Sequence, residues 1–124
     1  MVLAGKRVLV VEAEFLVALD IQRMLERAEA GETVFARGIA EAAELGAHFP
    51  QYGLAIVELP PNDGLAALAL LERLRSGGIP VIATMTTGPS PEHVPPAIPI
   101  LYKPFDEAAL LAACRSAFDG QLKG

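Results

Sequence analysis

"LAIVELPPNDGLAALALLERLRSGGIPVIAT", residues 54–84, decides the fold because two apolar runs flank one helical segment. The runs at 54–57 and 79–84 are continuous rather than alternating, which is typical of strands buried on both faces of a parallel sheet. The segment 64–78 between them is rich in alanine and leucine and is long enough for a helix. The stretch therefore predicts a strand, a crossover helix and a second strand parallel to the first.

The same alternation continues on both sides of this unit. Further strands are expected at 7–11, 33–36 and 98–102, and further helices at 15–29, 38–49 and 106–120. Strands and helices that alternate in units of about 25 residues predict a doubly wound sheet of five parallel strands, with helices on both faces and right-handed crossovers.

Several helix boundaries carry residues that are typical of caps. The expected boundary residues are Asn62 and Asp63 before the helix at 64–78, Gly77 and Gly78 after it, Asp106 and Glu107 at the start of the last helix, and Gly120 at its end. Short polar side chains satisfy free amides at a helix start, acids there favour the helix dipole, and glycine ends a helix easily.

The stretch "TTGPSPEHVPPAIP", residues 86–99, breaks the rhythm with five prolines. Proline lacks an amide donor and costs about 3 kcal/mol inside a helix. We therefore expect the helix between the fourth and fifth strands to be short, distorted or absent.

The length and composition of the chain limit the classes of function. The 124 residues suit a single domain, 1–124, with one site. The net charge is -5 and no basic cluster is longer than Lys6-Arg7, so binding to nucleic acid or to a membrane surface is not expected. No apolar run approaches the ~20 residues needed to span a bilayer, and the N-terminus lacks a secretory pattern. We expect a cytoplasmic protein in which Cys114 forms no internal disulfide and is a small buried hydrophobic residue.

Chemistry is expected where the strands end, because ligands of such sheets bind outside the carboxyl ends of the strands. The residues at these ends are Glu12, Ala13 and Glu14 after the first strand, Glu58 after the third, Thr84, Met85 and Thr86 after the fourth, and Lys103 and Pro104 after the fifth. Carboxylates and one ammonium group should therefore gather at one edge of the sheet. His48 and His93 lack the spacing of a metal site.

The chain resembles, over essentially its whole length, the receiver domain of bacterial two-component response regulators. The resemblance rests on "RVLVVEAEFLVALDIQRMLE" (7–26), "LAIVEL" (54–59) and "ILYKPFDEAALLAA" (100–113). It implies the flavodoxin-like fold. In that family an aspartate that ends the third strand takes a phosphoryl group from a histidine kinase. An acidic pair after the first strand helps to hold Mg²⁺, a Ser or Thr contacts the phosphoryl oxygens, and a lysine pairs with them.

Carried over by position, the resemblance implies an atypical member that lacks the phosphoacceptor aspartate. Glu58 stands at the phosphoacceptor position, and Glu12 at the first acidic position. Ala13 supplies no carboxylate at the second, and Met85 stands at the hydroxyl position. Only Lys103, followed by proline, matches fully. Mg²⁺ binding is therefore expected to be weak or absent, and no other cofactor or resident metal is expected.

Three points stay open at these positions. Thr84 or Thr86 could supply the missing hydroxyl if the strand register slips by one residue. Glu14 could reach toward a cation, although an exposed acid at a helix start explains it as well. Tyr102 stands where the family carries a residue that moves between exposed and buried states, and a fixed packing role is equally compatible with the sequence.

The leading hypothesis is a non-enzymatic signalling and protein-interaction module that works without phosphorylation. In it Glu58 and Lys103 form a fixed ion pair, with Glu12 competing for the lysine; the alternative is two unpaired surface groups. Two other functions are possible from the sequence. One is a working phosphoacceptor that uses Glu58 with a metal shell from Glu12 and Glu14, and the other is a small-molecule site made more apolar by Met85 and Pro60. The partner is expected to be a protein, for example a histidine kinase, a downstream signalling protein or a second copy. No output domain lies within 1–124.

Overall fold

The computed structural model describes residues 3–60, 64–86 and 94–123. Of residues 121–123 it describes only the backbone. The strands are β1 (Val8–Val11), β2 (Thr33–Ala36), β3 (Leu54–Glu58), β4 (Val81–Met85) and β5 (Ile100–Tyr102). The helices are α1 (Phe15–Arg27), α2 (Ile39–Ala43), α3 (Leu65–Ser76) and α4 (Glu107–Lys123), with a 3₁₀ helix, η1, at Gly46–Gln51. The five expected strands are confirmed, although β1, β4 and β5 begin one or two residues later than predicted.

All five strands run parallel in the order β2-β1-β3-β4-β5. This is the flavodoxin-like order, in which the chain moves outward in opposite directions from the neighbouring strands β1 and β3. The predicted fold class is confirmed. The loops that follow β1 and β3 leave the sheet on opposite sides of that point, so the ends of these strands frame a natural place for a site.

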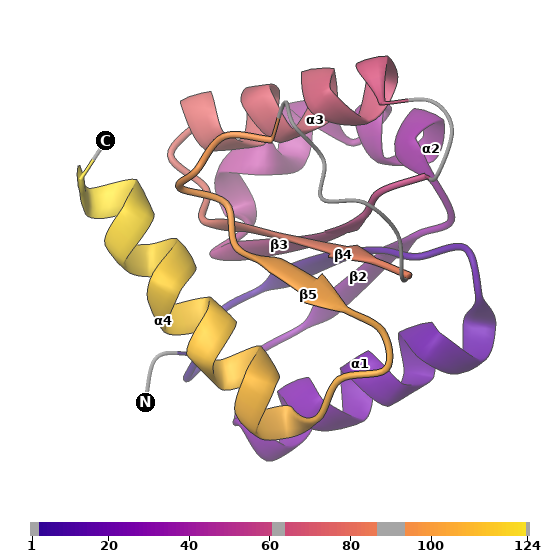
Figure 1. Ribbon diagram of the computed structural model, residues 1–124, viewed down its shortest axis with the longest axis vertical. Coiled ribbons are helices and arrows are strands. Elements are labelled where there is room, and N and C mark those ends of the chain that lie inside the picture. The colour runs from indigo at the N-terminus through magenta and orange to yellow at the C-terminus, as the bar shows by residue number, and fades with distance from the viewer. Residues whose placement is uncertain (1–2, 61–63, 87–93, 124) are drawn as a thin grey trace.

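Helices cover both faces of the sheet in three layers (Figure 1). The helices α2 and α3 lie on one face, and α1 and α4 lie on the other. Neighbouring residues of β1 serve the two layers in turn, because successive side chains of a strand point to opposite faces. Leu9 and Val11 pack in the core beside α3, whereas Val8 and Val10 pack in the core beside α1 and α4. This double burial explains why the strands are continuous apolar runs.

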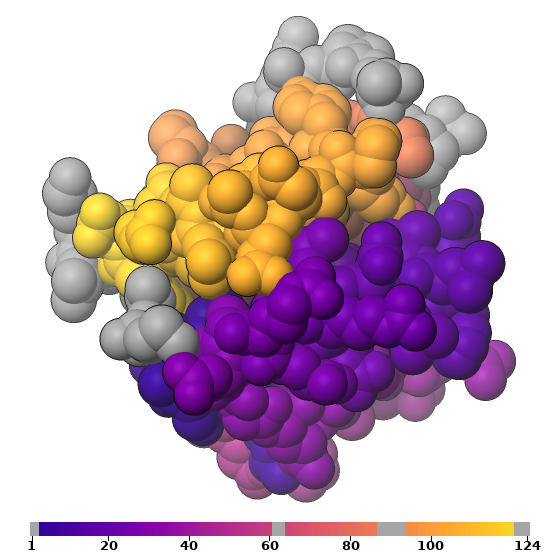
Figure 2. Space-filling model, turned by 90° about the horizontal axis from the view of Figure 1, so that it is seen from below, coloured from indigo at the N-terminus to yellow at the C-terminus, as the bar shows by residue number. Residues whose placement is uncertain are grey.

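The helices α1 and α4 lie side by side, in purple and in orange to yellow, on the face shown in Figure 2. An ion pair of 2.6 Å between Arg27 Nε and Glu107 Oε1 joins them at the surface. Cys114 is fully buried in the core beneath these helices. Burial raises the pKa of its thiol to about 11, so the expectation of a small buried hydrophobic residue is confirmed.

The helix predicted at 38–49 is wrong in its extent. The α-helix ends at Ala43, and the chain continues as the 3₁₀ helix η1. Gly46 lies so close to the Arg73 guanidinium that a Cβ at this position would overlap it. Pro50 lies inside η1 and has no amide to donate to a longer α-helix. The chain therefore forms the narrower 3₁₀ helix at this point. Arg73 also stacks here on the ring of Phe49, 5.0 Å from its centroid.

The start of α3 differs from the prediction and its end agrees with it. Gly64 occupies the N-cap position without a side-chain cap, while Asn62 and Asp63 lie outside the described residues. Gly77 caps the other end. Gly78 follows with φ of +85°, a left-handed conformation that glycine adopts without strain.

The last helix starts as predicted but does not end at Gly120. Asp106 Oδ1 accepts a hydrogen bond of 2.8 Å from the Ala109 amide, so it caps the helix. The helix continues through Gly120 to Lys123. A Cβ at position 120 would lie 2.7 Å from the carbonyl oxygen of Ala97. Glycine is therefore present because the helix passes close to the loop before β5, and not because the helix stops there.

The connection between β4 and β5 contains no helix within its described residues, Thr86 and 94–99. The rest of the proline-rich stretch, 87–93, lies outside the described residues. Ile98 anchors the described part with 4% of its surface exposed, and its amide donates to the carbonyl of Pro95 at 3.0 Å. Within the described residues, no helix is both long and apolar enough to cross a bilayer.

Candidate functional site

Lys103 is the centre of the candidate site. It directly follows β5, its amide donates to the carbonyl of Met85 at 2.8 Å, and a cis peptide bond joins it to Pro104. Its Nζ donates to Glu58 Oε2 at 2.6 Å and to Glu12 Oε1 at 2.9 Å. An ammonium group has three donors, so one lysine can serve both carboxylates. The ion pair predicted between Glu58 and Lys103 is present, and Glu12 shares the lysine instead of displacing Glu58.

Glu12 is the more deeply buried of the two acids. It follows β1 with 5% of its surface exposed, and its Oε2 accepts a hydrogen bond of 3.0 Å from the Glu14 amide. Burial raises the pKa of Glu12, and the bonds from the Glu14 amide and Lys103 offset this only in part, so its pKa lies above the usual value. Of the two acids, Glu12 is therefore the one that takes up a proton first as the pH falls.

Glu58 is the last residue of β3 and is more exposed, with 25% of its side chain accessible. Its Oε1 accepts a hydrogen bond of 3.1 Å from the Ala13 amide. Burial acts to raise the pKa of Glu58, but the bonds from Lys103 and the Ala13 amide outweigh it and hold the pKa below the usual value. The same two carboxylates hold the pKa of Lys103 above its usual value in spite of burial.

Two backbone amides complete the site. Ala13 and Glu14 each donate an amide hydrogen bond to one of the carboxylates. Sequence reasoning weighed only their side chains and missed these donors. The available signal is their place just before α1, because the first amides of a helix have no partner within the helix.

The charges of this cluster determine which ions it can hold. Two carboxylates and one ammonium group leave a formal charge of -1, and the lysine side chain is only 10% exposed. An added phosphoryl group would meet two acids and a lysine that already donates a hydrogen bond to each of them. Mg²⁺ requires several oxygen ligands in an octahedral arrangement. Position 13 offers no carboxylate, and the described residues contain no group of three His, Cys, Asp or Glu side chains suited to a metal ion. Weak or absent Mg²⁺ binding therefore stays a prediction.

The three candidate hydroxyl positions fall in different environments. Thr84 lies in register with Glu58 and is 1% exposed, and Met85 follows it as the half-buried last residue of β4. Thr86 lines a hollow of about 300 Å³ beside α1, together with Lys103 and Pro104. The structure thus brings Thr86 near the lysine, and the role of all three positions stays a prediction.

The other predicted residues lie around this cluster. Glu14 is the exposed N-cap residue of α1 and makes no side-chain cap bond. Tyr102, the last residue of β5, is 39% exposed. His48 Nδ1 lies 3.5 Å from the amide nitrogen of the Gln51 side chain, and His93 lies outside the described residues.

Comparison with solved structures supports the fold, whereas neither comparison by sequence finds a match: no protein-family model matches the sequence, and no curated protein matches it. A response regulator receiver protein from Sinorhizobium medicae WSM419 superposes with a TM-score of 0.79 at 16% identity, covering 94% of this chain and 97% of that one. SdrG from Sphingomonas melonis Fr1 gives 0.75 at 21% identity, covering 94% and 98%.

A third solved structure is similar along nearly its whole length. It is the signal receiver domain of an HD domain-containing protein from Pseudomonas fluorescens Pf-5, with a TM-score of 0.72 at 24% identity and coverage of 97% and 99%. Identities this low establish a shared fold and leave function to the residues of this chain. The described residues of the chain adopt the receiver fold.

Proposed function

We propose that this chain is a receiver-fold signalling module that binds a partner protein and works without phosphorylation of β3. One observation carries the proposal: Lys103 Nζ lies 2.6 Å from Glu58 Oε2 and 2.9 Å from Glu12 Oε1. In the receiver domains that the sequence resembles, a lysine at this position pairs with the phosphoryl group. Here the protein supplies both of its anionic partners.

The longer side chain of Glu58 gives the pair its geometry. Glutamate is one methylene, about 1.5 Å, longer than aspartate, so its carboxylate extends further from the end of β3 toward the lysine. Charge-assisted hydrogen bonds of this length are strong and directional. In the proposal, the Glu58 carboxylate replaces a phosphoryl oxygen as the partner of Lys103. The carboxyl edge of the sheet is then held in one state and does not switch.

The proposal assigns no catalytic step to the cluster. Phosphoryl transfer requires a metal and cationic groups around the transferred group. This cluster carries a net negative charge, and we expect it to bind Mg²⁺ weakly or not at all. The partner proposed is a protein of a signalling pathway, such as a histidine kinase or a downstream component, because this is the class of partner that the resemblance to receiver domains implies.

The test is intact mass spectrometry after incubation with acetyl phosphate and Mg²⁺. The parent chain is compared with a variant carrying Glu58→Asp, Ala13→Asp and Met85→Thr, and with the matched control Ala13→Asp, Met85→Thr. We expect one added phosphoryl group on the triple variant and none on the parent or the control. A phosphoryl group that maps to Glu58 of the parent would overturn the proposal. If the triple variant is folded but unmodified, the cleft is not a receiver site that regains phosphoryl transfer.

A further inference from the structure

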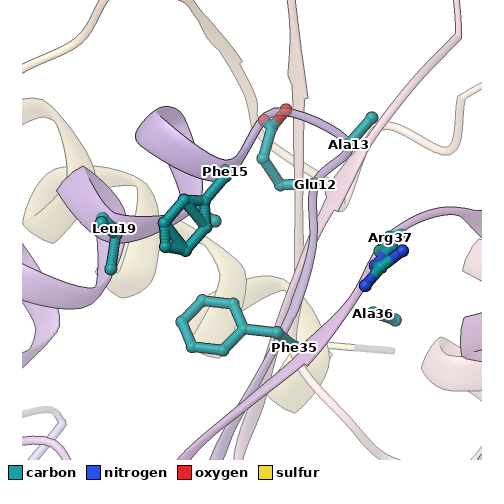
Figure 3. A pocket seen from close by; sticks show the side chains of 8 residues that line it. Glu12, Ala13, Phe15, Leu19, Phe35, Ala36 and Arg37 are labelled. Carbon is teal, nitrogen blue, oxygen red and sulfur yellow. The ribbon is translucent and has the colours of Figure 1, made fainter.

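An apolar hollow lies between α1 and β2, at the carboxyl ends of β1 and β2. Its volume is about 490 Å³, and its walls include Phe15 and Leu19 from α1, Phe35 from β2 and Arg37 directly after β2. The rings of Phe15 and Phe35 flank the space in Figure 3. The hollow therefore lies at the edge of the sheet where folds of this kind bind their ligands.

The aromatic walls of this hollow are largely uncovered. Phe15 is 69% exposed and Phe35 is 39% exposed. The volume falls within the range of about 300–1,000 Å³ that is typical of small-molecule sites. Two rings that flank a space of this size favour a third ring beside them, because aromatic pairs gain from offset or edge-to-face contact as well as from burial. The walls are thus suited to a flat aromatic ligand.

Arg37 supplies the charge that this hollow presents to a ligand. Among the eight residues that line it in the described part of the chain, only Glu12 and Arg37 carry charge. The Glu12 carboxylate points away from the two rings in Figure 3, and its oxygens accept hydrogen bonds from Lys103 and the Glu14 amide. The Arg37 side chain is exposed, and no residue that the structure describes forms a hydrogen bond or an ion pair with it. Its planar guanidinium is therefore available to hold a carboxylate through two parallel hydrogen bonds.

We propose that this hollow binds a small aromatic carboxylate. The ring of the ligand lies against Phe15 and Phe35, and its carboxylate pairs with the Arg37 guanidinium. A neutral aromatic compound would leave the guanidinium unused, and a compact anion would leave the two rings uncovered. The whole chain carries a net charge of -5 and does not attract anions at long range. Recognition of the carboxylate therefore depends on Arg37 itself.

A ligand in this hollow would also contact the loop that holds the lysine cluster. Glu12 and Ala13 line the hollow, and the Ala13 amide donates a hydrogen bond of 3.1 Å to Glu58. The occupied hollow would restrict this loop without placing the ligand in the cluster. The ligand would thus give the module a chemical input that is separate from its protein partner.

The test is a fluorescence titration of indole-3-acetate with the full chain. The chain contains no tryptophan, so indole emission reports the ligand alone when it is excited beyond the absorption of the tyrosines. We expect one saturable site that binds the acid about tenfold more tightly than its neutral counterpart indole-3-acetamide, because the amide loses the charge-assisted hydrogen bonds. In ¹H–¹⁵N spectra, the shift changes should centre on residues 13–19 and 35–37.

Two variants separate the contribution of the charge from that of the rings. Arg37→Met keeps an apolar stem and removes the guanidinium, so it should weaken binding of the acid about tenfold and leave the amide unchanged. Phe35→Ala should weaken both ligands by a similar factor, because both lose the same ring contact. Arg115→Met removes the same charge from the exposed surface of α4 and serves as the matched control. It should bind both ligands as the parent does.

Three outcomes would overturn the proposal. The first is a titration of the parent that does not saturate, and the second is equal affinity of the parent for acid and amide. The third is a loss in Arg37→Met that is the same for both ligands or is matched by Arg115→Met. Octanoate carries the same carboxylate on an aliphatic chain, and binding as tight as that of indole-3-acetate would overturn the aromatic class.

Two features of this test keep its result unambiguous. The comparison of acid, amide and octanoate uses the parent chain alone, so it decides the proposal even if a variant does not fold. Circular dichroism and melting temperature identify such a variant. No part of the titration involves phosphorylation or a partner protein, so a negative result would leave the proposed function standing, and failure of the proposed function would leave the ligand site standing.

Discussion

Lys103 depends on its ion pairs with Glu12 and Glu58 to remain charged at a largely buried position. Its side chain is 10% exposed, and those of Glu12 and Glu58 are 1% and 25% exposed. Charges in such places are stable only while they are paired, because burial removes their hydration. The cluster should therefore tolerate loss of all three charges better than loss of the lysine alone.

Replacing Lys103 by Met is expected to lower the free energy of unfolding by about 3 kcal/mol, because it leaves two partly buried acids without a cation. Urea unfolding at pH 7 measures the change. The matched control adds Glu12→Gln and Glu58→Gln to Lys103→Met and should recover most of the loss. Equal destabilisation of the single and triple variants would contradict the pairing.

The two acids should titrate in a defined order. The pKa of Glu12 is raised and that of Glu58 is lowered from the ordinary value of 4.5. The side-chain carboxyl carbon of Glu12 should therefore titrate above pH 4.5 in a ¹³C NMR titration, and that of Glu58 below it. The reverse order would show that the burial and hydrogen bonds described here are wrong.

The raised pKa of Glu12 and the lowered pKa of Glu58 make the stability of the fold depend on pH in opposite directions. The charged Glu58 stabilises the fold above pH 4.5, and this contribution is lost as the pH falls through its lower pKa in the folded state. For Glu12 the favourable contribution belongs to the protonated form. It is present below pH 4.5 and is lost as the pH rises through the higher pKa of the folded state. The Glu12→Gln variant should remove the second effect and keep the first.

At the scale of single residues, the sequence was sufficient to place both acids and the lysine at one edge of the sheet. The apolar strands end on them, and parallel strands share that edge. The sharing of Lys103 between Glu12 and Glu58 could not be predicted, because it depends on side-chain reach and on the distances between strand ends. The amide donors at Ala13 and Glu14 were equally out of reach, since any residue except proline has an amide.

At the scale of elements, boundaries follow from contacts as much as from local preference. Alternating apolar runs and helical segments predicted every strand to within two residues, and most of the helices. The helix at 38–49 was overextended because its interruption depends on Arg73, which approaches Gly46 from α3. Gly120 was assigned as a helix end because its partner, Ala97, is remote in sequence.

Gly120→Ala provides a test of that contact. Alanine favours a helix over glycine by about 1 kcal/mol, so local preference alone would stabilise α4. A Cβ would lie 2.7 Å from the Ala97 carbonyl oxygen, and we expect a net loss of about 1–2 kcal/mol in thermal or urea unfolding. Gly38→Ala is the control, because a Cβ there has no neighbour within 4 Å. A stabilised Gly120→Ala variant would refute the contact.

At the scale of the whole molecule, two cores enclose the sheet and control access to its interior. Cys114 is fully buried and its thiol has a pKa of about 11. At pH 8 the native chain should therefore react with a thiol reagent such as DTNB at least a hundredfold more slowly than the urea-unfolded chain, because the reactive thiolate is scarce and covered. Fast labelling of the native chain would show that α4 opens readily.

The fold class of the whole molecule was also predictable, because strands that are continuously apolar require helices on both faces of the sheet. The apolar hollow between α1 and β2 was not. Phe35 lies on β2, a strand at the edge of the sheet, and Phe15 lines the same hollow from the start of α1.

The shared lysine also bears on how the sheet opens. Lys103 follows β5, a short edge strand of three residues, and its bonds reach acids on β3 and just after β1. An edge strand of this length would ordinarily fray well before the centre of its sheet. Here fraying would have to break two charged contacts at once, so the outermost strand is coupled to the innermost ones. Hydrogen exchange of the β5 amides should then follow the global unfolding equilibrium in the parent chain and become a separate, faster event once the lysine is removed.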